Sequence, residues 1–575
     1  MKTTESKILT RDYTFEQYQE MVVCSSLWAA AGDSLGWITE LSRGKDGVQF
    51  RSGNTRVSET VKWRRKIGGR FGATVDLPAG TYSDDTQLRL SVGRAIRGNG
   101  IFDVEVFAKI ELPVWQSYSL GAGIGSMAAA ENLSKRNVNW FSNFFRTKKQ
   151  QYINSGGNGA AMRIQPHVWS SHSSIEELIA QVLRNALVTH GHPHGFCGAV
   201  FHALCLRDVI LKKKISPIDQ AYVFLDMVDK IPSLIDADSE LSTFWKGHWE
   251  TEANISLKQA IAEFKSEALA DVDRVVTLLK NDRQPDYHEV LELLGCLAPK
   301  YRGSGFKTAF AAFVLAVISK NDSIENALIL SANELESDTD TISTMAGALL
   351  GLVSNYRPKW AVQDTEYLIS EAVRLAKIGW GYEQTSFGYP DLTTWTAPTN
   401  QSDAVAALDK GVALAGLGEL QPLSEEFATK DAIWQWFQLP YGQSILAKRR
   451  KTKISEMPKG QMPTQNLIPS ATSRKSAPEQ SNFAFNHASN EQEEEAHQIR
   501  NENHLKPEVF QGIDHATSEV INSGFDNTVF GRLLNLCIED TDSIESAMVF
   551  AAIVAKAKLA RKRRRSNSNT TQQMD

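Results

Sequence analysis

Two clusters of aspartates are the residues of this chain whose type and spacing suit metal chemistry. They are Ser83-Asp84-Asp85-Thr86 and Asp338-Thr339-Asp340-Thr341. Hard divalent cations such as Mg²⁺ need several oxygen ligands, and carboxylates supply both oxygen and charge. If folding brings the two clusters together, they could hold two metal ions and activate a water molecule. The fold decides whether they meet, because the clusters lie far apart in the chain.

Each cluster opens an apolar pattern with helical spacing. The first pattern runs through Leu88, Leu90, Val92, Ala95 and Ile96, and it ends at Gly98 and Gly100. The second runs through Ile342, Met345, Ala346, Leu349 and Leu350. Both patterns place carboxylates at a helix N-terminus, where the helix dipole favours their ionised form. For either cluster alone, an ordinary N-cap is the simpler interpretation.

Further motifs weigh against ordinary caps. Gly32-Asp33-Ser34-Leu35-Gly36 ends an apolar helical stretch that begins near Tyr18, and Glu40 follows it. A glycine-rich loop, Ser155 to Arg163, leads into a helix, and backbone amides in such a loop can cradle phosphate. Thr189-His190-Gly191-His192-Pro193 follows another helical segment.

In this order and with these spacings, the motifs resemble those of the ADP-ribosylglycohydrolase family over about residues 20 to 378. Several motifs in order are far more specific than a single glycine loop. The resemblance implies an all-α fold, a compact orthogonal helical bundle with two Mg²⁺ ions (Mn²⁺ possible) at its centre. It also implies a hydrolase that cleaves the glycosidic bond between ADP-ribose and a protein side chain or another acceptor.

The resemblance assigns roles to individual residues. The implied metal ligands are Ser83, Asp84, Asp85, Asp338, Asp340 and Thr341. The implied contacts to the diphosphate and distal ribose are Ser155, Gly157, Asn158 and Gly159, with His190 near the ADP-ribose. Glu40 would lie near the metals and gate or ligate them.

The expected chemistry suits these residue types. Glycosidic cleavage at ribose passes through an oxocarbenium-like transition state. Two metal ions can fix the ribose hydroxyls and polarise a bound water, and a carboxylate can take its proton. Glu40 and Asp85 are the candidates for that base.

Two other functions remain open. Glu336 and Ser337 stand where family members commonly have two glycines, and their side chains would narrow the approach of backbone to ligand. This difference favours a non-catalytic module that binds ADP-ribose or a related nucleotide. A structural role, as in some crystallins of the family, is opposed by the complete set of aspartates.

A histidine-rich segment offers a zinc site as a competing interpretation. It contains His190, His192, His194, Cys197, His202 and Cys205. The spacing matches none of the usual structural zinc patterns. The segment from Val200 to Leu206 also has the pattern of a buried helix, where free cysteine is an ordinary core residue. We therefore expect no zinc here.

Composition indicates a cytoplasmic globular enzyme. The chain has 575 residues, enough for two or more domains. Its five cysteines are odd in number and scattered, so we expect no disulfide framework. The polar N-terminus lacks the apolar segment of a signal peptide. We also expect no transmembrane segment, because no apolar run looks long enough to span a bilayer.

The domain organisation is predicted from shifts in composition. Residues 15–400 form the catalytic domain, and residues 401–447 form a helical extension that docks on it through Trp434, Trp436 and Phe437. Residues 448–513 are a disordered linker, rich in Lys, Ser, Pro and Gln. Residues 514–565 form a small C-terminal helical segment, and residues 566–575 form a disordered tail.

A basic run, Arg561 to Arg565, ends the C-terminal helical segment. It could be a solvated helix end, which the helix dipole favours. It could equally contact nucleic acid or another anionic surface through phosphates. No recognisable nucleic-acid-binding fold accompanies it.

Overall fold

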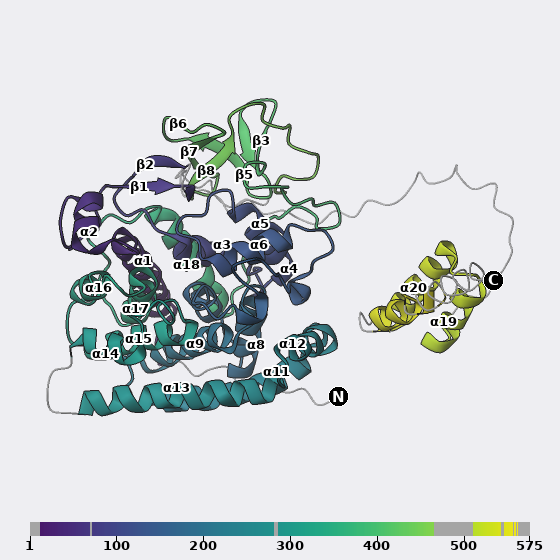
Figure 1. Cartoon of the computed structure of the whole chain (residues 1–575), viewed down its shortest axis with the longest axis horizontal. Helices are drawn as coiled ribbons and strands as arrows, with labels where there is room; N and C mark the ends of the chain where they lie inside the picture. The colour runs from purple at the N-terminus through teal and green to yellow at the C-terminus, as the bar shows by residue number, and fades with distance from the viewer. Residues whose placement is uncertain are drawn as a thin grey trace, which may run out of the picture. The chain divides into compact units, whose positions relative to one another are not determined.

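A computed structural model of the chain describes residues 12–69, 72–280, 286–464, 510–541, 546–555, 557–558 and 561. The chain divides into two compact units, residues 1–472 and 473–575. The first unit is a helical bundle with two small β-sheets, and the second is a small helical module (Figure 1). The all-α bundle predicted for the motif-bearing region is confirmed. Most of the predicted linker, residues 465–509, and the predicted tail from residue 566 lie outside the described residues.

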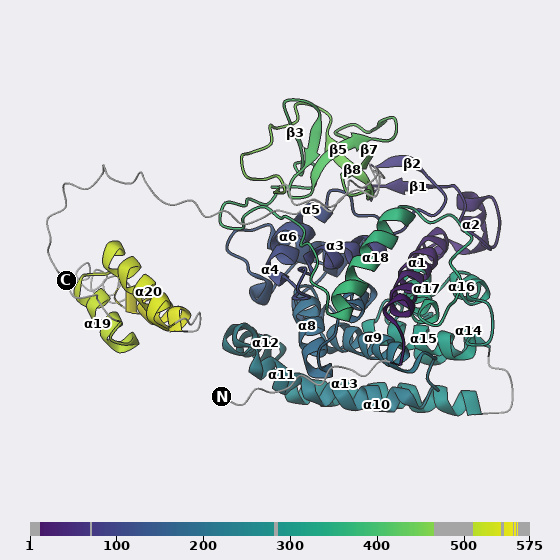
Figure 2. The ribbon, with the colours of Figure 1, turned by 180° about the vertical axis from the view of Figure 1, so that it is seen from behind.

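Helices α1 (Phe15–Thr39) and α17 (Thr339–Gly351) form the centre of the bundle and lie side by side in both views (Figures 1 and 2). Glycines permit this close approach. A Cβ at Gly32 would lie 2.3 Å from the carbonyl oxygen of Ser343, and one at Gly36 would lie 2.3 Å from that of Thr339. The packing therefore places the first turn of α17 directly against the last turn of α1.

The other helices of the first unit surround this pair. Those before α9 are α2 (Gly44–Ser52), α3 (Asp84–Ala95), α4 (Val104–Val106), η2 (Phe107–Glu111), α5 (Leu112–Trp115), α6 (Ile124–Leu133), η3 (Trp140–Ser142), η4 (Tyr152–Asn154), η5 (Ala161–Arg163), α7 (Gln165–Trp169) and α8 (Ile175–Leu187). The rest are α9 (Pro193–Lys212), α10 (Gln220–Asp226), η6 (Met227–Lys230), α11 (Ile231–Ala237), η7 (Leu241–Trp245), α12 (Lys246–Ala253), α13 (Leu257–Lys280), α14 (Tyr287–Leu294), α15 (Gly305–Ile318), α16 (Ile324–Ala332) and α18 (Thr365–Trp380).

Two of these helices, α1 and α9, are long and apolar enough by length and composition to cross a membrane. The expectation that no apolar segment has that length is therefore wrong. Of their most apolar windows, 94% and 78% is buried inside the bundle. A core helix that is covered on all sides has the same apolar character as a membrane span.

A six-stranded antiparallel sheet occupies residues 405–450, where short helices were predicted. Its strands are β3 (Val405–Ala407), β4 (Val412–Leu414), β5 (Gly418–Pro422), β6 (Phe427–Ala428), β7 (Ala432–Gln438) and β8 (Ser444–Arg450). They follow the order β3-β4-β5-β7-β6, with β8 also paired to β7. The helical prediction is wrong because three of the seven residues of β7 are aromatic and a fourth is isoleucine, and such residues favour a pleated, half-buried surface. The predicted packing role of Trp434, Trp436 and Phe437 is confirmed, since all three are buried.

The predicted boundary at residue 448 is also wrong, because the ordered unit continues beyond it. Strand β8 runs to Arg450. Gln461 is 3% exposed, accepts a hydrogen bond from the Thr396 backbone N–H and donates to the Thr394 carbonyl. Residues up to 464 therefore belong to the first unit.

A fully buried ion pair of the bundle is hydrogen-bonded to the sheet. Arg94 of α3 and Glu111 of η2 lie 2.8 Å apart, with neither side chain exposed. Arg94 also donates to Gln443, in the turn between β7 and β8, at 2.7 Å. Tyr389 donates its hydroxyl hydrogen to Glu111. The hydrogen bonds compensate for removing both charges from water.

A short hairpin, β1 (Trp63–Ile67) and β2 (Ala73–Leu77), lies beside this sheet. The pairing is antiparallel, with Arg65 opposite Val75. Strand β2 contacts β6. In both views the hairpin lies between the six-stranded sheet and the end of α1 that carries α2 (Figures 1 and 2).

The C-terminal unit has helices where the sequence predicts them. These are α19 (Ile513–Asn522), α20 (Asn527–Thr541) and a third helix, Ser546–Ala555. They share a small apolar core of Ala516, Val520, Leu533, Phe550 and Val554. Arg561 is exposed, whereas residues 562–565 of the basic run lie outside the described residues. Both interpretations of that run stay predictions.

Candidate active site

The two aspartate clusters meet at one cavity of about 690 Å³. Of the predicted site residues, those that line it are Glu40, Asp84, Asp85, Ser155, Gly157, Asn158, Gly159, His190, Asp338, Asp340 and Thr341. Thr341 donates to Asp85 across the junction of α17 and α3, at 3.4 Å. Ser83 is fully buried and does not line the cavity. The fold therefore brings together residues from both ends of the bundle sequence.

The first cluster is fixed by an aspartate of α1. Ser83 is the N-cap of α3 and accepts a hydrogen bond from the Asp85 backbone N–H at 3.3 Å. Asp33 accepts the backbone N–H groups of Ser83 and Thr86, each at 2.9 Å. This role of Asp33 was missed by the sequence analysis. The sequence signal for this role is that Asp33, a charged residue, stands between Gly32 and Ser34 in the apolar part of its helix.

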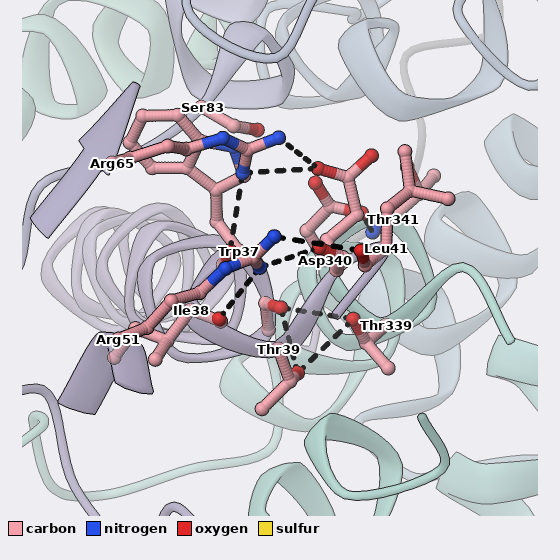
Figure 3. A network of polar contacts seen from close by, with 12 residues as sticks. Trp37, Ile38, Thr39, Leu41, Arg51, Arg65, Ser83, Thr339, Asp340 and Thr341 are labelled. Carbon is pink, nitrogen blue, oxygen red and sulfur yellow. Dashed lines mark hydrogen bonds and ion pairs between the residues drawn. The ribbon is translucent and has the colours of Figure 1, made fainter. Parts of the chain in front are cut away.

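The second cluster is fixed to α1 and to the glycine-rich loop. Thr339 donates to the Gly36 carbonyl at 2.9 Å, and Thr39 lies next to it (Figure 3). Asp338 is the N-cap of α17 and accepts a hydrogen bond from Asn158 at 3.0 Å. Asn158 therefore links the loop expected to bind phosphate to the carboxylates expected to bind metal.

The glycine-rich loop of Ser155 and Gly159 packs closely against a second glycine-rich segment, Gly121 to Ser126, at the cavity wall. A Cβ at Gly125 would lie 2.6 Å from the Ser155 hydroxyl oxygen, and one at Gly159 would lie 2.8 Å from that of Ser126. Gly125 lies in the first turn of α6, which the loop of Gly121 and Gly123 precedes. The residues of this segment that line the cavity are Gly121, Gly123, Ile124, Gly125 and Ser126. The sequence analysis missed this loop, although the spacing of Gly121, Gly123 and Gly125 was a signal for it.

The acidic side of the cavity has the character of a cation site. Asp84, Asp85 and Asp340 are at most 5% exposed. None of the four aspartates has an ion-pair partner among the described residues, and Asp85 Oδ1 is buried without a hydrogen-bond partner. Burial, reinforced by repulsion from neighbouring carboxylates, raises the pKa of each of these three aspartates well above its ordinary value. Buried carboxylates without an ion-pair partner fit a bound divalent cation.

The described residues contain no group of three His, Cys, Asp or Glu side chains that is already placed to hold a metal ion. The metal ligand set therefore stays a prediction. Whether the histidine-rich segment binds zinc likewise stays untested. His202 lies fully buried in α9 and contacts Gln165 at 3.2 Å, as a core histidine does.

Glu336 and Ser337 directly precede the second aspartate cluster. Glu336 is exposed and Ser337 is buried, and neither lines the cavity. Their side chains therefore leave the cavity space open.

His190 faces the glycine-rich loop as a neutral ring. Its Nδ1 lies 2.6 Å from the Thr189 hydroxyl, which accepts a hydrogen bond from Arg163 at 2.9 Å. The Ala186 carbonyl lies 3.5 Å from the Thr189 hydroxyl, so Nδ1 is the much nearer acceptor for the hydroxyl hydrogen. With Nδ1 as acceptor, the neutral ring carries its proton on Nε2, which faces the cavity. Burial, with a smaller contribution from Arg163, lowers the pKa of His190 to about 3.

This geometry predicts how ADP-ribose binding responds to His190. Changing His190→Gln should weaken ADP-ribose affinity roughly tenfold, since one hydrogen bond is lost. Because the lowered pKa keeps the ring uncharged as pH falls from about 8 to about 5, affinity should show no inflection from this group in that range. Calorimetric titration at several pH values measures both. An inflection near pH 6.5 that disappears in His190→Gln would contradict the neutral ring.

Comparison with known proteins matches the bundle. The family model described as ADP-ribosylglycohydrolase matches residues 18–376. The ADP-ribosyl-[dinitrogen reductase] glycohydrolase of Rhodospirillum rubrum is 28% identical over 168 residues, which are 29% of this chain and 50% of that protein. The ADP-ribosylhydrolase ARH3 of Homo sapiens is 25% identical over 278 residues, 47% of this chain and 70% of that protein. The alignment with the first relative thus spans only half of its length.

A solved structure titled "ADP-ribosylglycohydrolase-related protein complex" also matches, with a TM-score of 0.37 and 19% identity, over 63% of this chain and 99% of that one.

Proposed function

This chain belongs to the ADP-ribosylglycohydrolase family, and from that membership we propose that it cleaves the glycosidic bond of an ADP-ribosylated substrate and releases ADP-ribose. One observation supports the proposal most. The N-termini of α3 and α17 bring four aspartates to the same cavity as the glycine-rich loop. A phosphate-binding loop beside a buried acidic cluster suits a substrate that carries both a diphosphate and a ribose.

We propose that Asp84, Asp85, Asp338, Asp340 and Thr341 would hold two Mg²⁺ ions, or Mn²⁺ in their place, with Ser83 shaping the turn behind them. When bound, such ions would orient the ribose hydroxyls and polarise a water. Ser83 is better placed to position Asp85 than to face the cavity, because its hydroxyl is within 3.3 Å of both the backbone N–H and the carboxylate of Asp85.

The chain's own residues supply binding and proton transfer. Gly157 is half-buried next to His190, with no atom nearer than 3.6 Å to the position of a Cβ, so a diphosphate can approach its backbone closely. Gly159 is buried and gives room to Ser126 and His190. Asn158 donates a hydrogen bond to Asp338, which fixes the position of this loop relative to the second aspartate cluster. The diphosphate and the ribose of one substrate would therefore meet residues that are held at a constant separation. Glu40 and Asp85 remain the candidates for the base that takes a proton from water.

The non-catalytic alternative loses its main support. It rested on Glu336 and Ser337, and neither residue lines the cavity. All the aspartates expected as ligands do line it.

The test is a panel of defined ADP-ribose conjugates on arginine, on serine and on a nucleic-acid base. With Mg²⁺ present, we expect release of free ADP-ribose, measured by chromatography, from at least one conjugate. Tight ADP-ribose binding without release from any conjugate would instead support a binding module. The panel also identifies the acceptor.

A further inference from the structure

We propose that Arg65, on the β1–β2 hairpin, positions the carboxylate of Glu40 at the acidic side of the cavity. The inference rests on the function proposed above. Arg65 Nη2 and Nη1 lie 3.3 and 3.4 Å from Glu40 Oε2. The two side chains are 18% and 14% exposed, which limits screening of the pair by solvent.

Glu40 stands where α1 ends, and its backbone is held separately from its carboxylate. Its N–H donates to the Gly36 carbonyl at 2.9 Å, and Leu41, the next residue, has φ +50°. Arg51 donates to the carbonyls of Ile38 and Glu40, at 3.0 and 2.7 Å (Figure 3). Because Arg51 reaches only backbone oxygens here, Arg65 is the residue that orients the Glu40 side chain.

The Arg65 guanidinium is itself confined by two tryptophans. It lies 5.0 Å from the Trp37 ring and 5.8 Å from the Trp63 ring, both within the range of cation–π attraction. The two rings meet edge to face at 5.0 Å. Figure 3 shows Arg65 beside Trp37. A planar group stacked in this way loses little further freedom when it binds a carboxylate.

The six-stranded sheet supports the hairpin from the other side. Gly68, at the end of β1, has φ +86°, and a Cβ there would lie 2.9 Å from the Trp434 ring. Trp434 belongs to β7, so its ring packs closely against Gly68, the residue that follows β1. The sheet therefore sets the position of Arg65 indirectly.

Repulsion explains why Glu40 needs this partner. Glu40 lines the cavity together with Asp84, Asp85, Asp338 and Asp340. Without a cation beside it, like charge would turn its carboxylate away from the four aspartates. Arg65, which does not itself line the cavity, compensates that repulsion through its contact with Glu40 Oε2.

The hairpin offers a matched control variant. Arg64 precedes Arg65 on β1 but points outward, is 62% exposed and pairs with Asp76 at 2.7 Å. With a conjugate that the chain cleaves, Arg65→Gln should lower kcat about ten- to a hundredfold, as small misplacements of a reacting group do. KM and ADP-ribose affinity should stay within about twofold, since Arg65 does not line the cavity. Arg64→Gln should leave kcat unchanged, and Arg65→Lys should recover part of the loss.

A double-mutant cycle separates positioning from general damage. If Arg65 acts through Glu40, then Arg65→Gln should slow Glu40→Gln little further, because the group that it positions is already gone. The same four proteins should show coupling in urea unfolding, measured without substrate. Additive losses of kcat, or no coupling in urea, would overturn the proposal.

Failure of this inference and failure of the proposed function are distinguishable. A chain that cleaves no conjugate overturns the proposed function and the role of Arg65 within it. A chain that cleaves a conjugate, with Arg65→Gln as fast as Arg64→Gln, overturns the role of Arg65 alone.

Discussion

Replacing Asp85 or Asp340 with asparagine should lower the rate of ADP-ribose release by about 10²- to 10⁴-fold and leave the fold intact. Asparagine keeps the shape of aspartate and an oxygen that accepts hydrogen bonds, but it removes the charge that would bind a cation. Both aspartates are buried beside other carboxylates, with their pKa values raised, so the substitution also relieves repulsion. We therefore expect the melting temperature to be unchanged or slightly higher, and kcat to collapse.

Asp286→Asn is the matched control for this experiment. Asp286 caps α14, accepts the His288 backbone N–H at 3.0 Å and lies outside the cavity. It should cost at most about 1 kcal/mol of stability and spare turnover. Removing divalent ions from the unaltered chain with a chelator should abolish turnover, and Mg²⁺ or Mn²⁺ should restore it. Full activity without metal would show that the two clusters are helix caps and no more.

A chain that ends at Thr472 should cleave a small ADP-ribose conjugate as fast as the full chain, whereas one that ends at Lys448 should be destabilised and inactive. The shorter chain loses the β8 pairing of Arg449 with Ile433 and of Arg450 with Ala432. It also loses the buried Gln461. The hydrophobic core under the sheet would then face water, at a cost of about 25 cal/mol for each Å² exposed. Thermal melting and kcat on the same conjugate measure the difference.

The longer truncation also tests the C-terminal unit. Inactivity of the chain ending at Thr472 on the small conjugate would mean that this unit completes the active site. If activity is kept, any loss should appear only with a large or polyanionic target. Neutralising the basic run from Arg561 to Arg565 should then weaken binding most at low salt, where counterion release contributes most.

The helices that carry the site could be predicted from the sequence because their signals are local. Ser83 caps α3 and Asp338 caps α17 within a few residues of the apolar pattern that each begins. The contacts that complete the site are not local. Asp33 acts on Ser83 across 50 residues, and Asn158 acts on Asp338 across 180. No periodicity within one segment encodes such pairs.

The six-stranded sheet was mistaken for helices for a related reason. In a short segment such as β7, a run of apolar residues fits the period of a buried helix as well as that of a strand. What makes it a strand is its pairing with β8 and β5, and the β5 partners Gln421 and Pro422 lie well before it in the chain. The aromatic content of Trp434, Trp436 and Phe437 was the available signal for a strand.

The buried contact between Arg94 and Gln443 can form only late in the synthesis of the chain. Helix α3 starts with the cavity aspartates and carries Arg94 near its other end, yet Gln443 follows Arg94 by 349 residues. While the ribosome is still making the intervening chain, Arg94 and Glu111 have emerged without the turn that covers them. Since Arg94 then lacks its 2.7 Å acceptor on Gln443, the pair is more costly to bury, and we expect α3 to pack less stably until the strands around Gln443 are complete. We therefore expect nascent chains released before that point to need chaperones and to lack ADP-ribose binding, although every residue of the cavity has already been translated.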